Sequence, residues 1–400
     1  MIRLRMVIPE EPGVAPLYRN LLERYMSARP DVEVVLEQVE YETDPQYWRK
    51  IWEKRHETGL PDVIYTHYSW FPVAVRQGAL LDITERFQRA AHPPADFFDT
   101  TLKPFQYLGR LYTVPRETSS MVVFYNETLL RRQKLPLPNE LDAEGKWTWE
   151  TFRKLALAVA DPARDLWGAV APTEVPFSLF PVLRSFGCDI LSGASGRHFN
   201  VPEAVRAITM IRDMIVKDRS ALLPAADADR SVFTAGRAAF MIGGYWHIAV
   251  AMSFASDFEW DVAPIPYGTC RGTRTGAGGY SIAATSGHAD AAWELIEWLS
   301  LPDNALFLAQ SGLIIPALRR AAESERFLNP GKRPFHRCVF VEALEYGRPD
   351  PIIPRWDEVL FIVRDELGPV WTGKKEPEEA VRAIDARLNR LLAESSVPDD

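Results

Sequence analysis

Cysteine is almost absent from this 400-residue chain: Cys188, Cys270 and Cys338 are its only three, and they stand far apart. Their spacing provides neither a CxxC pair for a metal ion nor a disulfide framework. Seven histidines are scattered without an HExxH motif or paired ligand spacing, so we expect no metal site and no cofactor. The three thiols are therefore expected to be buried or half-buried side chains.

Long apolar runs and an excess of positive charge are also missing. No run approaches the roughly 18 apolar residues of a membrane-spanning helix, and the amino terminus, MIRLRMVIPEEPG, lacks the apolar stretch and cleavage site of an export signal. The net charge of −8 leaves too little basic surface for a nucleic-acid partner. The sequence is thus compatible with a cytoplasmic protein or with an exported protein whose signal was removed.

The chain has enough apolar material for two cores, because 47% of its residues are hydrophobic and single cores stop growing near roughly 250 to 300 residues. Its first part alternates between strand and helix patterns. Ile2 to Ile8 and Val32 to Leu36 alternate with period two, Leu17 to Met26 recurs at helical spacing, and Val63 to Tyr65 is a short apolar run. This order indicates an α/β lobe with a mostly parallel sheet.

A second set of similar patterns follows. The apolar strand Met121 to Tyr125 runs into Asn126, a good helix N-cap, and Thr148 is expected to cap the next helix. A further strand, Ala238 to Ile242, is predicted later in the chain. We expect the glycine-rich stretch Gly272 to Gly279 to be a flexible connection or cleft edge. No single linker separates the two sets, which favours lobes that exchange segments.

Seven segments occur in an order that resembles one known family. They are PDVIYTHYSWFPVAVRQGALLDIT from Pro61, GRLYTVPRETSSMVVFYNETLL from Gly109, WTWETFRKLA from Trp147, VFTAGRAAFMIGGYW from Val232, and then WDVAPIPYG, GAGGYSIAATS and AAWELIEWLS. Together they resemble the extracellular solute-binding proteins of family 1, the sugar-binding components of ABC importers, of which the maltose-binding protein is the familiar member. The loop after the third strand lacks the acidic residue that some maltose binders place there, so the resemblance does not assign the sugar.

The resemblance implies an α/β, two-lobed periplasmic-binding-protein-like fold of type II, with a mostly parallel sheet flanked by helices in each lobe and hinge crossovers between the lobes. We expect residues 1–114 and 266–315 in the first lobe, and 115–265 and 316–400 in the second. It also implies a non-enzymatic, monomeric binding component that holds a mono- or oligosaccharide, or a derivative, in the cleft between the lobes. Hinge closure would present the sugar to the permease subunits of an ABC transporter. The expected location is the periplasmic or extracellular face of the membrane, with a lipid anchor as one possibility.

Polar and aromatic residues follow three of the expected strands, where ligands bind in open α/β sheets. A sugar has an apolar ring face and a belt of hydroxyls, so its site needs flat aromatics and fixed hydrogen-bond partners. We expect tryptophans as stacking platforms, a tyrosine as a further wall, and carboxylates and arginines as groups that orient hydroxyls. The predicted ligand-binding residues are Glu11, Thr66, Ser69, Trp70, Arg116, Glu117, Ser119, Trp246, Gly279, Tyr280, Arg355 and Trp356.

Each of these residues also has an ordinary structural interpretation. A tryptophan is more often part of a core, Arg116 can pair with an acidic residue across the hinge, and Arg355 can pair with Asp357 or Glu358. Two other functions stay open: a binding protein of the same fold for a non-sugar solute, such as a polyamine, ferric iron or an organic anion, and a glycoside-active enzyme. The enzyme is the weaker alternative, because the glutamates show no acid and nucleophile spacing that a sequence can verify.

Overall fold

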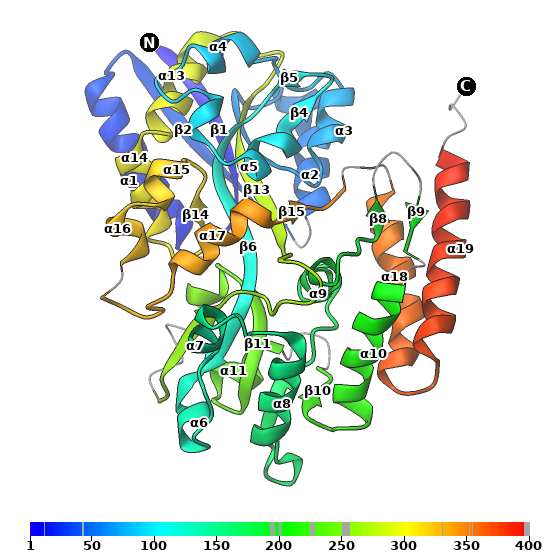
Figure 1. The fold of residues 1–400 in the computed structure, drawn as a ribbon. Helices are drawn as coiled ribbons and strands as arrows, with labels where there is room; N and C mark the ends of the chain where they lie inside the picture. The colour runs from blue at the N-terminus through cyan, green and yellow to red at the C-terminus, as the bar shows by residue number, and fades with distance from the viewer. Residues whose placement is uncertain are drawn as a thin grey trace. The chain divides into compact units, whose positions relative to one another are not determined.

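The computed structural model describes residues 1–11, 13–41, 44–192, 197–199, 202–224, 229–249, 257–329, 331–351, 353 and 355–395. The chain forms two compact units (Figure 1). Unit 1 comprises Met1–Ser119 and Thr275–Leu328, and unit 2 comprises Ser120–Arg274 and Asn329–Asp400. Each unit is therefore built from two separate stretches of chain. The lobe boundaries expected from the sequence stay a prediction.

The sheet of unit 1 is centred on β1 (Ile2–Pro9), which pairs in parallel with β2 (Val32–Val39) and β3 (Val63–His67). The alternating apolar residues of β1 that the sequence shows, Leu4, Met6 and Ile8, are all fully buried. Two helices, α1 (Val14–Ala28) and α2 (Asp44–Thr58), connect these strands. The predicted order of strand, helix, strand, helix, strand is confirmed.

The sheet of unit 2 has a parallel and an antiparallel part. β7 (Trp167–Val170) pairs in parallel with β10 (Ala221–Leu222) and β11 (Ala238–Gly244). β6 (Val114–Asn126) is antiparallel to β11 and to β12 (Trp260–Ala263). β6 begins in unit 1, where β14 (Ile315–Pro316) pairs with it, and ends in unit 2.

The remaining elements surround these sheets. In unit 1 they are α3 (Phe71–Arg76), α4 (Thr84–Gln88), α5 (Asp99–Leu102), β4 (Gln106–Tyr107), β5 (Arg110–Leu111), α13 (Ala289–Leu299), α14 (Pro302–Ala309), α15 (Arg319–Ala322) and α16 (Glu325–Leu328). In unit 2 they are α6 (Glu127–Arg132), α7 (Pro138–Ala143), α8 (Trp149–Val159), α9 (Leu179–Ser185), β8 (Leu191–Ser192), β9 (Arg197–His198), α10 (Pro202–Val216), α11 (Asp229–Thr234), α17 (Cys338–Tyr346), β15 (Arg348–Pro349), α18 (Trp356–Trp371) and α19 (Pro377–Ser395).

Two helix starts in unit 2 have the caps that the sequence predicts. The Asn126 side chain accepts a hydrogen bond from the Leu129 N–H at 3.0 Å and begins α6. The Thr148 hydroxyl accepts one from the Thr151 N–H at 3.3 Å and begins α8. Each cap satisfies a backbone donor that the first helical turn leaves unpaired.

The glycine-rich stretch corrects one expectation. From Arg274 onward it is not a flexible connection but β13 (Arg274–Ile282), an entirely buried strand that pairs antiparallel with β3. A Cβ on Gly278 would lie 2.1 Å from Glu117 Oε1, and one on Gly279 would lie 2.3 Å from the Val114 carbonyl oxygen. Glycine is needed here because neighbouring groups occupy the space of a side chain.

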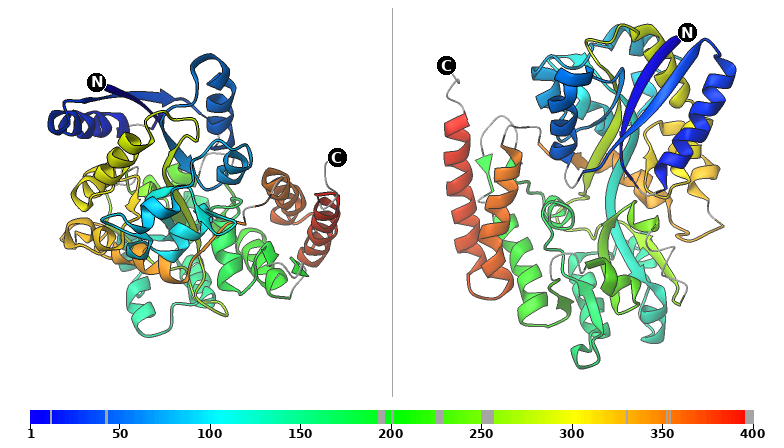
Figure 2. Two further views of the ribbon diagram at one scale, coloured as in Figure 1. Left: turned by 90° about the horizontal axis from the view of Figure 1, so that it is seen from above. Right: turned by 180° about the vertical axis from the view of Figure 1, so that it is seen from behind.

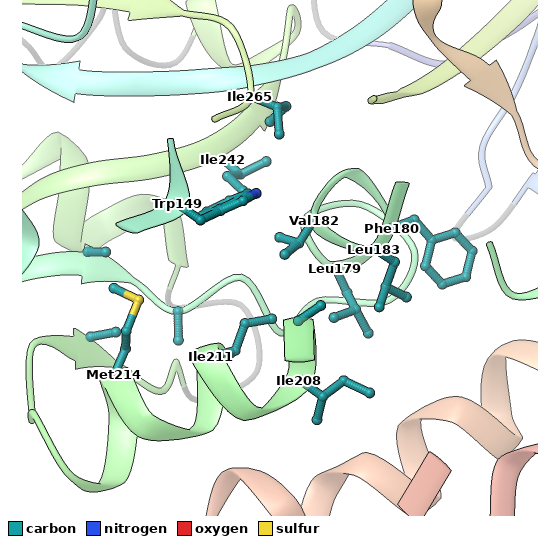
Figure 3. Packing of buried hydrophobic residues seen from close by; sticks show 14 of the residues in the cluster. Trp149, Leu179, Phe180, Val182, Leu183, Ile208, Ile211, Met214, Ile242 and Ile265 are labelled. Carbon is teal, nitrogen blue, oxygen red and sulfur yellow. The ribbon is translucent and has the colours of Figure 1, made fainter. Parts of the chain in front are cut away.

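The core of unit 2 gathers around α9 (Figure 3). Phe180 and Leu183 of this helix lie in the same buried cluster as Ile208 and Ile211 of α10 and Trp149 of α8. The long helices α18 and α19 lie side by side and pack against α10 (Figures 1 and 2). This packing positions α9, which carries Phe180, and the start of α18, which carries Trp356.

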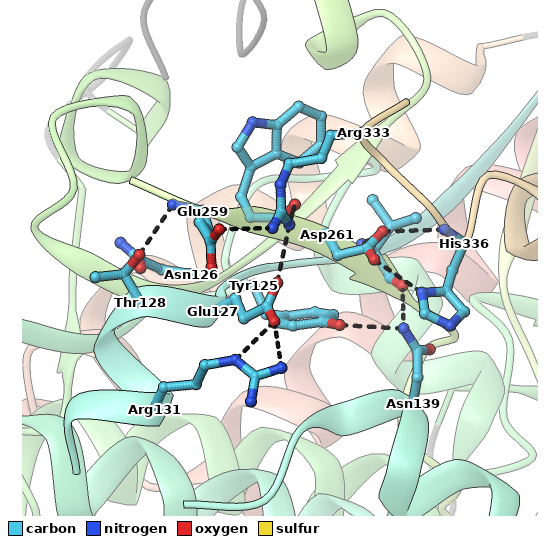
Figure 4. A network of polar contacts seen from close by, with 12 residues as sticks. Tyr125, Asn126, Glu127, Thr128, Arg131, Asn139, Glu259, Asp261, Arg333 and His336 are labelled. Atoms are coloured by element: carbon cyan, nitrogen blue, oxygen red, sulfur yellow. Dashed lines mark hydrogen bonds and ion pairs between the residues drawn. The ribbon is translucent and has the colours of Figure 1, made fainter. Parts of the chain in front are cut away.

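A polar network holds Arg333 and His336 against the start of α6 and against β12 (Figure 4). Arg333 Nη1 donates to Glu127 Oε2 at 2.8 Å and to the Trp260 carbonyl oxygen at 2.7 Å. The His336 backbone N–H donates to Asp261 Oδ1 at 3.1 Å. The segment that returns the chain to unit 2 is thus fixed by charge-assisted hydrogen bonds.

Candidate functional site

Unit 1 contains a buried group of tyrosines around Arg116 and the two carboxylates that pair with it, which we call the tyrosine cluster. Its members come from α1, α2, β3, β6 and β13 and from the segments that follow β1 and β3. They are Glu11, Tyr18, Tyr47, Tyr65, Trp70, Arg116, Glu117 and Tyr280. Because β1 and β3 are parallel, the segments that follow them lie at the same edge of the sheet, the edge at which open α/β sheets bind ligands.

The ion pair between Arg116 and Glu117 organises this cluster. Arg116 Nη1 donates to Tyr18 Oη at 2.9 Å, and Tyr65 Oη donates to Glu117 Oε1 at 2.7 Å. The Tyr18 and Tyr280 hydroxyls lie 2.5 Å apart. Arg116 and Glu117 are both buried, so their charges are compensated inside the protein rather than by water.

The tyrosines of this cluster are neutral over the physiological pH range. Burial raises the pKa of Tyr47, Tyr65 and Tyr280 well above the ordinary value of a phenol, and the nearby Glu117 carboxylate raises that of Tyr65 further. A neutral phenol in a fixed position is a hydrogen-bond donor as well as an acceptor. The cluster therefore supplies oriented donors next to carboxylates.

Two buried donors of the tyrosine cluster have no acceptor among the described residues. They are Tyr47 Oη and Trp70 Nε1, on rings whose centroids are 6.0 Å apart. A buried polar group without a partner costs about 1–3 kcal/mol. A ligand hydroxyl or a water molecule that accepted from either donor would remove that cost.

Unit 2 carries an aromatic surface at the carboxyl end of β11, made of Phe177 and Trp246. The two half-buried rings meet edge to face with centroids 5.9 Å apart, and the Arg274 guanidinium carbon lies 4.8 Å from the Phe177 ring centre. A Cβ on Gly244 would lie 2.2 Å from the Trp246 ring. The glycine at the strand end therefore lets the indole fold back over the backbone.

The positive charge of Arg274 is balanced by the buried carboxylate of Asp350. Arg274 Nε donates to Asp350 Oδ2 at 2.8 Å, and Arg184 Nη2 donates to Asp350 Oδ1 at 3.2 Å. Arg184 also pairs with Asp189. The aromatic surface thus lies beside a buried group of two arginines and two aspartates whose formal charges cancel.

The structure brings together five of the predicted ligand-binding residues in the tyrosine cluster: Glu11, Trp70, Arg116, Glu117 and Tyr280. Tyr280 is fully buried, so its expected role as an aromatic wall is not supported by exposed ring surface. The Trp70 ring is 2% exposed and stacks on Trp48 at 4.9 Å. Trp70 can therefore donate a hydrogen bond from Nε1, but its ring does not present the open stacking face that we expected.

Four further predicted residues of unit 1 lie outside the tyrosine cluster, and two of them have side-chain partners of their own. The buried Thr66 hydroxyl donates to Ser281 Oγ at 2.8 Å, and Ser69 Oγ lies 2.8 Å from His67 Nδ1. Ser119 is half-buried, at the end of the unit 1 part of β6. Gly279 has no side chain to offer and serves the close packing of β13.

Of the predicted residues in unit 2, only Trp246 lies on the aromatic surface. Arg355 forms an exposed ion pair with Glu358, with N–O distances of 2.6 and 2.8 Å, and a further one with Glu394. This is the structural alternative that the sequence left open. Trp356 packs edge to face on Phe180 of the unit 2 core. Ligand contact by either residue stays a prediction.

Sequence reasoning missed several members of both groups. Tyr18 and Tyr47 lie inside helices, where their spacing marks them as ordinary core residues. Phe177 lies in a loop before α9 and Arg274 at the start of β13, with no local pattern around either. A usable signal existed for Tyr47: α2 follows β2, so its first turns lie at a strand's carboxyl end, like the loops that we did consider.

Known proteins resemble this chain in both sequence and fold. The profile of the bacterial extracellular solute-binding proteins matches residues 9–306. The chain belongs to this family. A galactooligosaccharide-binding protein of Bacillus subtilis is 23% identical over 334 residues, which cover 78% of this chain and 75% of that protein.

Solved structures of proteins of similar length have the same fold as this chain. An ABC substrate-binding protein of Listeria monocytogenes, in complex with cycloalternan, matches with a TM-score of 0.83 at 20% identity over 98% of this chain and 99% of that chain. The sugar-binding protein of Xanthomonas citri matches with a TM-score of 0.83 at 20% identity over 98% of both chains. The resemblance stated from the sequence and the predicted type II α/β fold are thereby confirmed, and so is the solute-binding role.

Membrane-spanning helices and metal-binding clusters are both absent from the described residues. None of the helices among the described residues is both long and apolar enough to cross a bilayer. Within the same residues, no group of three or more histidine, cysteine, aspartate or glutamate side chains is arranged to hold a metal ion. The family is extracellular by its description, so this chain is a member of an extracellular class of solute-binding proteins.

Proposed function

We propose that this protein binds a neutral carbohydrate and delivers it to the permease of an ABC importer. The observation that carries the proposal is the tyrosine cluster, where neutral phenol and indole donors lie beside carboxylates and two buried donors lack an acceptor in the described part of the chain. A polyhydroxyl ligand can accept from such donors and donate to such carboxylates at the same time. The half-buried rings of Phe177 and Trp246 supply the apolar surface that a sugar ring face requires.

Charge argues for a sugar over the alternatives. An organic anion would need an arginine available for it, but Arg116 and Arg274 are each engaged by a buried carboxylate. A polyamine would need free carboxylates, whereas Glu117 is already paired with Arg116 and accepts from Tyr65. The sugar ligands named for the similar proteins from Bacillus and Listeria agree with this choice.

The same arrangement favours a binding protein over a glycosidase. A glycosidase needs one carboxyl group that gives up its proton and a second that acts as base or nucleophile. The ion pair with Arg116 and the hydrogen bond from Tyr65 hold Glu117 in a structural role. We propose a monomer that acts outside the cytoplasm with the permease as its protein partner; its anchoring, and the binding position between lobes that the resemblance implies, stay predictions.

A thermal-shift screen tests the proposal. The purified protein is heated with maltotriose or galactooligosaccharides, and separately with spermidine or citrate. A ligand at 100 times its dissociation constant stabilises the folded state by about 2.7 kcal/mol, so a binding sugar raises the melting temperature. A shift with spermidine or citrate and none with any sugar would overturn the carbohydrate assignment.

A pair of tryptophan variants then tests the site. Trp246→Ala should weaken sugar binding about five-fold or more, the loss expected for a stacking ring. Trp167→Ala is the matched control, because Trp167 is also half-buried in unit 2 and its Nε1 is bound to Asp165. Equal sugar affinity in the two variants would remove Trp246 from the site.

A further inference from the structure

A separate cavity lies inside unit 1, between α2 and the strands β1 and β2. Its volume is about 650 Å³, within the range of roughly 300–1,000 Å³ typical of small-molecule sites. Close packing normally closes the space between a helix and the sheet that it covers. None of the tyrosine-cluster residues lines this cavity, so its properties are independent of the proposed sugar site.

The cavity has an apolar floor and a charged rim. Val7 of β1, Val39 of β2 and Ile51 of α2 form the floor. At one end the rim is an ion pair, in which Arg5 Nε donates to Glu37 Oε1 at 2.6 Å and Arg5 Nη1 donates to the Thr58 carbonyl oxygen at 2.7 Å. The charges of Arg5 and Glu37 cancel at that end.

The other part of the rim is positive. Lys50 and Lys54 stand one turn apart on α2 and both line the cavity. The Lys50 ammonium donates to the Glu40 backbone oxygen at 2.7 Å, a neutral acceptor, and no carboxylate of the described residues forms an ion pair with it. For Lys54, the described residues place no carboxylate oxygen within 4 Å of the ammonium. Counting the Glu40 side chain, which also lines the cavity, three cations face two carboxylates.

We propose that this cavity is a second ligand site, which binds a small organic anion with an apolar body. The apolar part of the ligand lies on Val7, Val39 and Ile51, and its carboxylate or similar group lies at Lys54 and Lys50. An apolar ligand with a positive group is disfavoured by the same two ammonium groups. No covalent step is involved, and sugar binding by the tyrosine cluster does not depend on it.

Two probes of the same shape and opposite charge test the proposal by titration calorimetry: 4-phenylbutyrate and 4-phenylbutylamine. The wild-type protein should bind phenylbutyrate at one site and phenylbutylamine at least about five-fold more weakly, as expected from charge contacts near a surface. Lys54→Glu should reverse this preference. Lys374→Glu, the same change at an exposed lysine of unit 2, should leave it unchanged.

A cavity-filling variant gives the decisive result. Ile51→Trp should abolish phenylbutyrate binding, whereas Ile51→Val should retain it, and melting curves show whether both variants are folded. The sugar-induced thermal shift should persist in Ile51→Trp, so a failure of the sugar proposal would be seen separately. Equal affinity for the two probes, or phenylbutyrate binding that Ile51→Trp does not weaken, would overturn the second site.

Discussion

The two units hold their buried charges in opposite ways. In unit 1 a single arginine, Arg116, lies among carboxylates and tyrosines, and the rings around it are buried while the Glu11 side chain is 23% exposed. In unit 2 the single carboxylate of Asp350 is shared by two arginines, and the neighbouring Phe177 and Trp246 rings are only partly buried. Unit 1 therefore offers directional hydrogen bonds, and unit 2 offers apolar ring surface beside a neutralised cluster.

The largest effect should come from removing the shared carboxylate of unit 2. Asp350→Ala should lower the free energy of unfolding by about 4–5 kcal/mol, because it removes a buried carboxylate that pairs with both Arg274 and Arg184. Urea unfolding followed by circular dichroism measures this change. Glu358→Ala, which breaks an exposed ion pair with Arg355, should leave the unfolding midpoint almost unchanged, because water already screens both charges. A similar loss of unfolding free energy in both variants would show that burial of the ion pair does not determine the cost of removing its carboxylate.

A tryptophan exchange in each unit sharpens the contrast between sealed and exposed rings. Trp70→Ala should cost about 3–4 kcal/mol of unfolding free energy, because it removes a fully buried ring that stacks on Trp48. Trp246→Ala should cost about half of that or less, because part of its ring already meets water. The same urea unfolding experiment reports both. If Trp246→Ala were as destabilising as Trp70→Ala, Trp246 would be a core residue and the aromatic surface would lose its main member.

The alternation of strands and helices in unit 1 could be predicted because local periodicity carries it. The buried positions of β1 and the caps at Asn126 and Thr148 depend only on nearby residues. The strand character of the glycine-rich stretch could not be predicted in this way. Gly278 and Gly279 are required by contacts with Glu117 and Val114, which are distant in the sequence.

The candidate site was predicted best where it follows a strand end. Trp246 lies directly after β11, where the sequence placed it. Tyr18 and Tyr47 were missed because helical spacing marks a buried face but does not reveal that the polar end of a tyrosine meets a charge or lacks an acceptor. For Arg355 the sequence offered Asp357 or Glu358 as ordinary partners, and the structure shows Glu358 together with Glu394, which is too distant in the sequence to have been expected.

Replacing Gly278 of β13 tests how tightly the tyrosine cluster of unit 1 is packed. Gly278→Ala should cost about 2 kcal/mol, because the added Cβ would lie 2.1 Å from Glu117 Oε1 and 2.3 Å from Tyr65 Oη and would force apart their hydrogen bond. Gly287→Ala is the control, since a Cβ there meets nothing within 4 Å, and it should change stability by about 0.5 kcal/mol or less. An unchanged unfolding midpoint for Gly278→Ala would mean that the cluster has room to relax.

The smallest expected effect is a pH dependence of stability. It arises in the polar network of unit 2 that contains Glu127 and Arg333. Burial alone would raise the pKa of Glu127, but hydrogen bonds from Arg333 and Arg131 outweigh it and hold that pKa below its usual range. A carboxylate with a lowered pKa in the folded state contributes stability above its unfolded pKa of about 4.3, and this contribution is lost as the pH falls through the folded pKa. Glu127→Gln should therefore be less stable than the wild type at neutral pH, by about 1 kcal/mol or less. The difference should shrink on acidification below about pH 4, since the wild type then loses the same charge. Urea midpoints measured across this pH range test the sign: a difference that grows on acidification would mean that Glu127 is not held as a carboxylate by its two arginines.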